Sequence, residues 1–278
     1  MVTTSLGATG PRVFPVALGC MGMSGVYGAT SDDASAALIG NAIDRGITMI
    51  DTGDFYAHGH NELLVGRAIA GRRDKVQLSV KFGMMRSPDG GIGGADCRPA
   101  AVKNFAGYSL RRLGVEVIDV YRPARLDPQV PIEDTIGAIA ELVKAGYVRH
   151  IGLSEVGVET IRRAAKVHPI VDLQIEYSLV TRKPEDRIFP VLSELGVGAT
   201  LYGVMSRGLL TGSKLTAGDM RGRMPRFTAG NRATNDRVVA SIGAFAADHH
   251  RTPGELLIAW ALAKQPAFAP VIGARTPA

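Results

Sequence analysis

The sequence predicts an α/β protein whose eight parallel strands close into a (β/α)8 barrel, the TIM barrel. Three observations lead to this prediction. Short runs rich in Val and Ile recur along the 278 residues, longer segments with helical spacing lie between them, and the runs number eight. Eight strands close a parallel barrel, and such barrels commonly take about 250 residues. We therefore expect residues 1–278 to form a single domain.

The eight apolar runs are predicted to be buried parallel strands, because their apolar residues are continuous rather than alternating. In chain order the runs cover residues 15–19, 47–51, 76–82, 117–121, 148–154, 171–177, 197–202 and 269–274. The segments between them predict helices at residues 61–70, 99–113, 131–145, 158–167 and 186–195. In the third of these, Ile132, Ile136, Ile139 and Val143 fall on one face, as an amphipathic helix requires.

The two ends of the chain carry further predictions. A Gly-Ala-Thr-Gly-Pro turn at residues 7–11 predicts an N-terminal β-hairpin that closes the bottom of the barrel. Only residues 275–278 follow the last strand, so we expect the eighth helix to be absent from this sequence. A doubly wound open sheet is the alternative fold, but no G-x-G-x-x-G sequence follows the first strand.

Hydrophobic residues make up 46% of the chain and charged residues 21%, which is enough apolar material for a large core. The 32 Lys and Arg residues outnumber the 26 Asp and Glu residues, giving a net charge of +6. A nucleic-acid partner is not predicted, because the basic residues are spread along the chain and their clusters, such as Arg72-Arg73, are short. A small anionic ligand explains the excess equally well.

The two cysteines, Cys20 and Cys97, have a spacing that fits neither a disulfide framework nor a zinc site. We expect no metal and a reducing, cytoplasmic location. The first residues lack the apolar core of a signal peptide, and no run approaches the roughly 20 apolar residues that span a bilayer. Secretion and a membrane partner are therefore not predicted.

Reacting groups of such barrels lie at the carboxyl ends of the strands, and three polar side chains fall there. Asp51 ends the second predicted strand, Tyr56 follows it, and Lys81 lies near the end of the third. An ammonium near a phenol favours the ionised phenol and eases proton donation, while a carboxylate can hold that ammonium in place. The alternative is structural: Asp51 caps the next segment, Tyr56 is a surface aromatic residue, and the Lys81 stem packs on apolar surface.

Residues 51–66, DTGDFYAHGHNELLVG, resemble the D-T-A-x-x-Y-G-x-G-x-N-E-x-x-L-G segment of the aldo-keto reductase superfamily. Asp51 and Tyr56 fall on two catalytic positions of that segment, and Lys81 falls on the catalytic lysine. Four later segments resemble the family's cofactor-binding segments in the same order: GLSE (152–155), QIEYS (174–178), LYGVMSRGLLTG (201–212) and PVIGART (270–276). The resemblance covers essentially the whole chain.

The resemblance implies a barrel that binds NADPH and moves hydride between it and a carbonyl carbon, with Tyr56 protonating the oxygen. It places Ser154 and Gln174 on the carboxamide, Tyr202 on the nicotinamide ring and the loop at 203–209 on the diphosphate. A guanidinium at Arg275 could bind a 2′-phosphate, which favours NADPH over NADH. The implied cofactor-binding residues are Cys20, Met21, Asp51, Ser154, Gln174, Tyr202, Gly203, Ser206, Arg207, Gly208, Leu209, Gly273 and Arg275.

Structural roles are the alternative for some of these residues. Tyr202 also fits an ordinary aromatic residue at a strand end, and Cys20 and Met21 also fit the core. Glu155 stands where many relatives carry asparagine against the carboxamide, so that contact is not expected to follow the family.

The chain also departs from the family at the fourth catalytic position. There a histidine stands five residues after the aspartate of I-D-x-Y; here that aspartate is Asp119, and the fifth residue on is Ala124. Arg122 lies on the same face of the strand, so we assign Arg122 and Ala124 to a candidate substrate pocket. Arg122 would act as a substitute donor or as an anion site that selects acidic substrates. The alternative is a buried arginine paired with a barrel carboxylate.

The leading interpretation is an NADPH-dependent oxidoreductase that reduces aldehydes or ketones to alcohols, with a small carbonyl compound as its substrate. Retained Asp51, Tyr56 and Lys81 favour this enzyme. The alternative is a cofactor-binding barrel with a redox-sensing or regulatory role and weak or no turnover, because the histidine is missing. A metal-dependent hydrolase ranks third, since the strand ends carry no H-x-H pair or carboxylate cluster.

Overall fold

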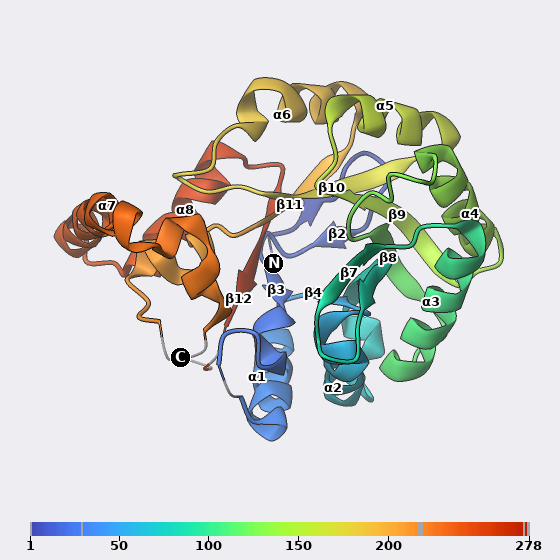
Figure 1. Cartoon of the computed structure of the whole chain (residues 1–278), viewed down its shortest axis with the longest axis horizontal. Coiled ribbons are helices and arrows are strands. Elements are labelled where there is room, and N and C mark those ends of the chain that lie inside the picture. Colours follow the sequence, from blue (N-terminus) through green and yellow to red (C-terminus); the bar gives the residue numbers. More distant parts are fainter. Residues whose placement is uncertain (1, 29, 216–218, 275, 277–278) are drawn as a thin grey trace.

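The computed structural model describes residues 2–28, 30–215, 219–274 and 276. Eight parallel strands form a closed barrel in the order β10-β11-β12-β3-β4-β5-β8-β9 (Figure 1). The strands are β3 (Ala17–Gly19), β4 (Met49–Gly53), β5 (Gln77–Phe82), β8 (Ile118–Pro123), β9 (Val148–Ser154), β10 (Ile170–Glu176), β11 (Gly198–Tyr202) and β12 (Ala269–Gly273). The predicted (β/α)8 barrel is confirmed, and the open doubly wound sheet is excluded.

Helices alternate with the strands and cover the outside of the barrel (Figure 1). They are α1 (Asp32–Asp44), α2 (His60–Ile69), α3 (Pro99–Leu113), α4 (Ile132–Lys144), α5 (Val158–Val167), α6 (Pro184–Leu195), α7 (Ala229–Asp248) and α8 (Pro253–Lys264). The five predicted helices correspond to α2 through α6. Both α7 and α8 lie between β11 and β12, and within the described residues β12 is the last element.

Local sequence signals set several helix ends. Ser31 caps α1 by accepting a hydrogen bond from the amide of Ala34, and Thr252 and Glu255 form a reciprocal capping box at the start of α8. Gly114 ends α3 in the left-handed conformation that glycine adopts without a steric penalty. These signals stop each helix where the chain must turn back into a strand.

The predicted N-terminal hairpin is confirmed. Strands β1 (Thr4–Ser5) and β2 (Arg12–Val13) are antiparallel, and the fully buried Leu6 packs inside the barrel. Gly7 brings the turn against the strand bottoms so closely that a Cβ there would lie 2.6 Å from the carbonyl oxygens of Val171 and Gly196. The hairpin thus closes the N-terminal end of the barrel and leaves the opposite end open.

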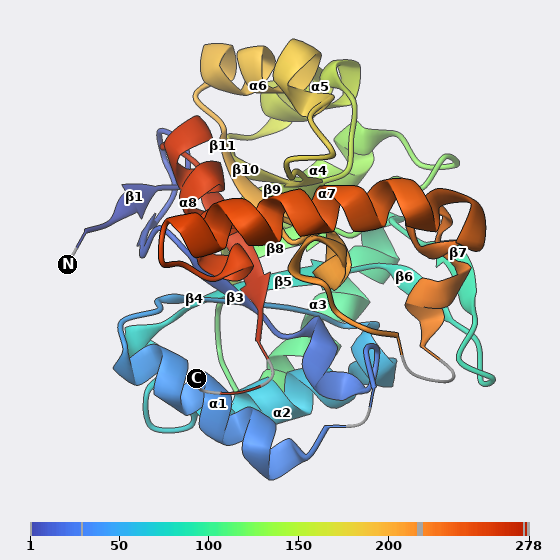
Figure 2. The same cartoon turned by 90° about the vertical axis from the view of Figure 1, so that its left-hand side faces the viewer.

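Irregular segments surround that opposite end. An antiparallel hairpin of β6 (Met84–Arg86) and β7 (Ile92–Ala95) separates β5 from α3. Short 3-10 turns follow several strands: η1 (Met21–Ser24) follows β3, η2 (Tyr56–Gly59) follows β4, and η4 (Ser206–Thr211), η5 (Met220–Arg223) and η6 (Pro225–Phe227) follow β11. Figure 2 shows α7 and α8 on the same side of the barrel as β12. None of the helices in the described residues is long and apolar enough to cross a membrane.

Candidate active site

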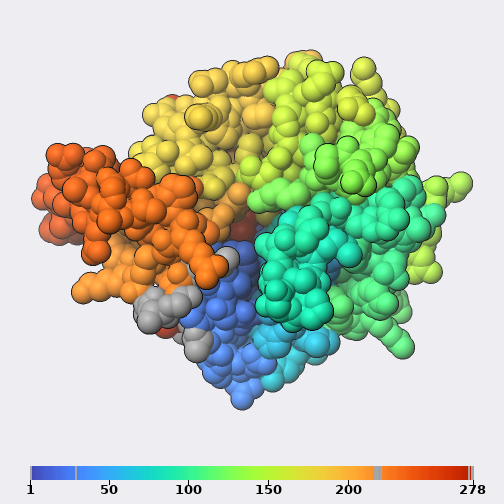
Figure 3. All heavy atoms as spheres, in the orientation of Figure 1, coloured from blue at the N-terminus to red at the C-terminus, as the bar shows by residue number. Residues whose placement is uncertain are grey.

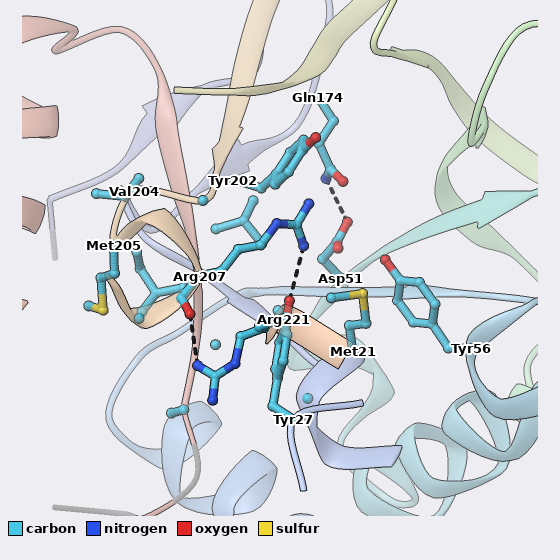
Figure 4. Close-up of a pocket in the computed structure, with 18 of the residues that line it drawn as sticks. Met21, Tyr27, Asp51, Tyr56, Gln174, Tyr202, Val204, Met205, Arg207 and Arg221 are labelled. Atoms are coloured by element: carbon cyan, nitrogen blue, oxygen red, sulfur yellow. Dashed lines mark hydrogen bonds between the residues drawn. The ribbon is translucent and has the colours of Figure 1, made fainter. Parts of the chain in front are cut away.

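The structure brings the three predicted catalytic side chains together at the carboxyl ends of β4 and β5. Lys81 Nζ lies 2.5 Å from Asp51 Oδ1 and 5.3 Å from the centroid of the Tyr56 ring. All three residues are buried, and the Tyr56 hydroxyl is turned toward Asp51 (Figure 4). The pairing of β4 with β5 sets this arrangement, because it places Gly53 beside Lys81 and Asp51 one inward-facing step deeper.

Asp51 is held as an anion by several donors. Besides Lys81, its carboxylate accepts hydrogen bonds from Ser79 Oγ and Gln174 Nε2, each at 2.8 Å. Burial alone would raise the pKa of Asp51, but the charges of Lys81 and Arg122 outweigh it and hold the pKa below its usual value. Asp51 therefore fixes the position of the lysine ammonium.

Tyr56 keeps its proton. Burial, followed by the negative charge of Asp51, raises the pKa of Tyr56 well above that of a free tyrosine. This differs from the expectation that Lys81 would ease ionisation of the phenol. The reason is that Asp51, at 2.5 Å, balances the charge of Lys81. Desolvation therefore has the largest effect on the pKa of Tyr56.

Arg122 does not reach the pocket, contrary to its assignment as a substrate residue. Its guanidinium is fully buried and donates to Asp172 Oδ2 at 2.9 Å, to Ser79 Oγ at 2.9 Å and to Thr200 Oγ1 at 3.2 Å. Gly152 makes room for this ion pair, because a Cβ there would lie 2.7 Å from Asp172 Oδ1. The structure therefore agrees with the alternative role of Arg122, a buried arginine that pairs with a carboxylate of the barrel.

Ala124 likewise does not line the pocket. It is 1% exposed, and its amide donates to the carbonyl oxygen of Phe82. Its methyl side chain therefore contributes no hydrogen-bond donor to the cavity.

A cavity of about 580 Å³ opens above the catalytic side chains. Figure 3 shows the surface hollowed between the blue N-terminal part, the teal β6–β7 hairpin and the orange segment after β11. Of the predicted cofactor residues, those that line the cavity are Met21, Asp51, Ser154, Gln174, Tyr202, Gly203, Arg207, Gly208 and Gly273. Its volume lies in the range of cofactor and small-molecule sites.

Three other predicted cofactor residues do not line the cavity. Cys20 is fully buried in the core, the alternative given for it. Ser206 is buried as well, and its hydroxyl accepts a hydrogen bond from Arg226 Nη1 at 2.7 Å. Leu209 is absent from the lining, and Arg275 lies outside the described residues.

Sequence reasoning missed a contact that crosses the cavity (Figure 4). Arg207 Nη1 donates to the hydroxyl of Tyr27 at 3.1 Å, and its guanidinium carbon lies 5.8 Å from the centroid of the Tyr202 ring. Arg221 Nη1 donates to the carbonyl oxygen of Arg207, and Arg221 also lies over the Tyr27 ring. The arginines after residue 206 were a signal for an anion site, but nothing local in the sequence pointed to Tyr27.

This side of the cavity suits an anionic ligand. Ser206, Arg207 and Gly208 have φ of 48°, 58° and 89°, a tight turn of the kind that presents backbone amides to anions. Arg207, Lys214 and Arg221 line the cavity here, Arg221 being paired with Asp219 at 2.6 Å. Asp51, at the other end, is the single acidic lining residue in the part of the chain that the structure describes. A diphosphate therefore fits the lining residues.

Glu155 is not among the residues that line the cavity. Its φ is 52°, and its Oε1 accepts a hydrogen bond from the amide of Glu176 at 2.8 Å. Burial, and then the nearby charge of Glu155, raise the pKa of Tyr202. Glu155 thus supports the strand end that carries Tyr202.

Comparison with known proteins agrees with this geometry. The model of the Aldo/keto reductase family matches residues 15–278. A Glycine max protein named "Probable aldo-keto reductase 1" is 39% identical over 277 residues, which covers 96% of this chain and 79% of the relative. The chain belongs to the aldo-keto reductase family.

Two solved structures share the fold. A glycerol dehydrogenase from Gluconobacter oxydans superposes with a TM-score of 0.88 at 28% identity, covering 99% of this chain and 86% of that one. An aldo-keto reductase from Bacillus halodurans, solved in its holo form, gives a TM-score of 0.83 at 29% identity, covering 100% of this chain and 87% of that one. Membership of this family makes the protein an oxidoreductase that uses a nicotinamide cofactor on small molecules. Within the described residues, no group of His, Cys, Asp or Glu could hold a metal ion.

Proposed function

We propose that this protein reduces aldehydes or ketones to alcohols with NADPH, and that Tyr56 is the general acid. The observation that carries the proposal is the buried Lys81–Asp51 ion pair beside a protonated Tyr56, at one end of a cavity whose other end is lined by arginine and lysine. Reduction of a carbonyl group needs one proton for the oxygen and a place for the anionic cofactor, and the two ends meet these needs.

The lining residues divide between the parts of the cofactor. Gln174 donates its amide N–H to Asp51, so its carbonyl oxygen is left to accept from the carboxamide, beside Ser154. The Tyr202 ring offers a flat apolar face for the nicotinamide, and the turn at 206–208 with Arg207 suits the diphosphate. When bound, the reduced nicotinamide supplies the hydride that the carbonyl carbon receives.

The chain's own residues handle the proton. The Tyr56 hydroxyl donates its proton to the carbonyl oxygen as negative charge develops there. The phenolate left behind lies near the Lys81 ammonium, which stabilises it, and Asp51 keeps that ammonium in place. The high pKa of Tyr56 keeps its hydroxyl protonated until the reaction begins. The developing alkoxide can still take this proton, because it is a stronger base than a phenolate.

The cellular setting proposed is a reducing cytoplasm. Both Cys20 and Cys97 are free and buried, so neither forms a disulfide in this fold. NADPH reduction requires no disulfide, and we propose neither a nucleic-acid nor a membrane partner.

The Tyr56→Phe variant tests the proton donor. We expect it to lower kcat for aldehyde reduction by at least about 100-fold, because one hydroxyl on the reacting oxygen is lost. NADPH oxidation would be followed by absorbance against a panel of aldehydes, ketones and quinones. NADPH affinity, measured by fluorescence titration, should change little because the hydroxyl serves the substrate.

The exposed Tyr108 supplies the control, since Tyr108→Phe removes a hydroxyl far from the cavity lining and should leave kcat unchanged. A Tyr56→Phe protein that turns over at the parent rate would remove Tyr56 from the mechanism.

The second candidate function is a regulatory barrel that binds NADPH and reports its redox state with little or no turnover. It is favoured by Ala124, whose buried methyl group supplies no donor at the histidine position. The same two measurements separate the candidates: binding of NADPH without oxidation across the substrate panel would favour the regulatory role.

A further inference from the structure

Arg125 lines the cavity and directly follows Ala124, the residue at which the sequence resemblance places the family's histidine. It follows β8, and the barrel order places β8 four strands away from β12, on the opposite wall. Arg207 and Arg221 follow β11, the neighbour of β12. Arg125 is therefore separated from the cationic end that suits the diphosphate, and it lies at the end that holds Tyr56.

The charge of Arg125 acts on the reacting end of the cavity. Its guanidinium lines the same cavity as Tyr56 and Tyr202, and its positive charge opposes the rise in the pKa of both phenols. Arg125 Nη1 donates to the carbonyl oxygen of Ala124 at 2.6 Å. In the described part of the chain it forms no ion pair, and the nearby Asp127 carboxylate instead accepts from the amides of Cys97 and Gln129.

The cavity that Arg125 lines also has apolar lining residues. Phe55 follows β4, and Met84 and Ile92 come from the β6–β7 hairpin. A guanidinium has five N–H donors, and the Ala124 carbonyl oxygen takes one of them, so enough donors remain to bind a carboxylate in bidentate fashion. The substrate end of the cavity therefore combines apolar side chains with the Arg125 cation, which has no ion-pair partner among the described residues.

We propose that Arg125 binds a carboxylate on the substrate, so that the protein prefers aldehydes or ketones that carry a carboxylate group. This inference rests on the proposed reductase function and narrows its substrate class. Arg125 takes the role of anion site that the sequence had suggested for Arg122, while Arg122 is committed to Asp172.

Matched substrates test the proposal in the intact chain. The value measured is kcat/KM with NADPH for 4-carboxybenzaldehyde divided by that for its methyl ester, methyl 4-formylbenzoate. We expect Arg125→Gln to lower this ratio by about 10- to 100-fold, the usual worth of a charge-assisted hydrogen bond. Arg187→Gln on the outer surface of α6 removes the same charge away from the cavity and should leave the ratio unchanged. An unchanged ratio in Arg125→Gln would overturn the proposal.

A second measurement does not depend on turnover. Calorimetric titration with benzoate and with its neutral counterpart benzamide should show tighter binding of benzoate to the parent protein, and Arg125→Gln should remove that preference. If neither aldehyde is reduced, the proposed function fails, while the benzoate preference and its loss still support the anion site. Equal binding of benzoate and benzamide by the parent protein would refute the anion site itself.

Discussion

Buried charges in this barrel are paired with different carboxylates according to their depth. Lys81 pairs with Asp51 beneath the cavity, whereas Arg122 pairs with Asp172 one step deeper. Ser79 joins the two pairs, because its hydroxyl donates to Asp51 and accepts from Arg122. The catalytic lysine is thus held by a carboxylate that is itself oriented by the barrel interior, which preorganises the site.

Asp54 gives a prediction about stability and pH. It is buried beside the site, and burial raises its pKa to about 7. A carboxyl group with a raised pKa binds its proton more tightly in the folded state, so its contribution is greatest below the unfolded pKa near 4. We expect the contribution of Asp54 to stability to fall as pH rises from about 4 to 7, by up to about 4 kcal/mol.

The Asp54→Asn variant carries no titrating group at this position. Its stability relative to the parent should therefore increase as pH rises from about 4 to 7, and it should be more stable than the parent at pH 8. Urea unfolding at several pH values measures this effect. Asp33→Asn, on the exposed surface of α1, is the control. If Asp54→Asn keeps the parent's slope, Asp54 does not titrate in this range.

At the scale of the elements, strand β9 shows how one position adjusts the interior. Gly152 faces inward, where its missing side chain leaves space for the Arg122–Asp172 ion pair. The sequence predicted β9 from its apolar residues but offered no reason for a glycine in mid-strand, which ordinarily weakens a strand. The close approach of the guanidinium supplies that reason.

Gly152→Ala should destabilise the protein. The added Cβ would lie 2.7 Å from Asp172 Oδ1, and displacing one member of a buried ion pair costs about 3 to 5 kcal/mol. Thermal unfolding followed by circular dichroism measures the loss.

Gly137→Ala is the matched substitution. Gly137 lies within α4, and a Cβ added there would meet no atom within 4 Å, so alanine should raise stability by about 0.5 to 1 kcal/mol. Equal effects at the two positions would show that the ion pair does not constrain residue 152.

Some elements were beyond prediction for physical reasons. Strand β6 has only three residues, and β7 is mostly exposed and half glycine, so the hairpin lacks the apolar pattern that marks a strand. Helix α7 buries only Ile242 and Ala246, and so carries little helical periodicity. The hairpin contributes Met84 and Ile92 to the cavity lining, whereas α7 packs against η4, which carries Arg207.

At the scale of the whole molecule, the barrel has a closed end and a reactive end. The hairpin fills the bottom through Leu6, which is fully buried, while the strand tops carry the cavity. This division lets the bottom provide stability without taking part in chemistry, as is usual for this fold.

Leu6→Ala tests that division. Loss of a fully buried leucine side chain costs about 2 to 5 kcal/mol, which corresponds to a fall in Tm of roughly 5 to 15 °C. NADPH affinity at a temperature where the variant is folded should stay near that of the parent. Val2→Ala, at an exposed position before the hairpin, should leave Tm unchanged. Loss of NADPH binding with an unaltered Tm would contradict the assignment.

The sequence by itself determined the barrel and the meeting of Asp51, Tyr56 and Lys81, because the carboxyl ends of parallel strands come together at one face. Only the tertiary structure decided which side chains face the cavity. Tyr27 and Arg207 meet across it although 180 residues separate them, and Arg122 turns down to Asp172 while Arg125 lines the wall. Strand position fixes where a residue's backbone lies, but the direction of a long side chain depends on partners that other strands supply.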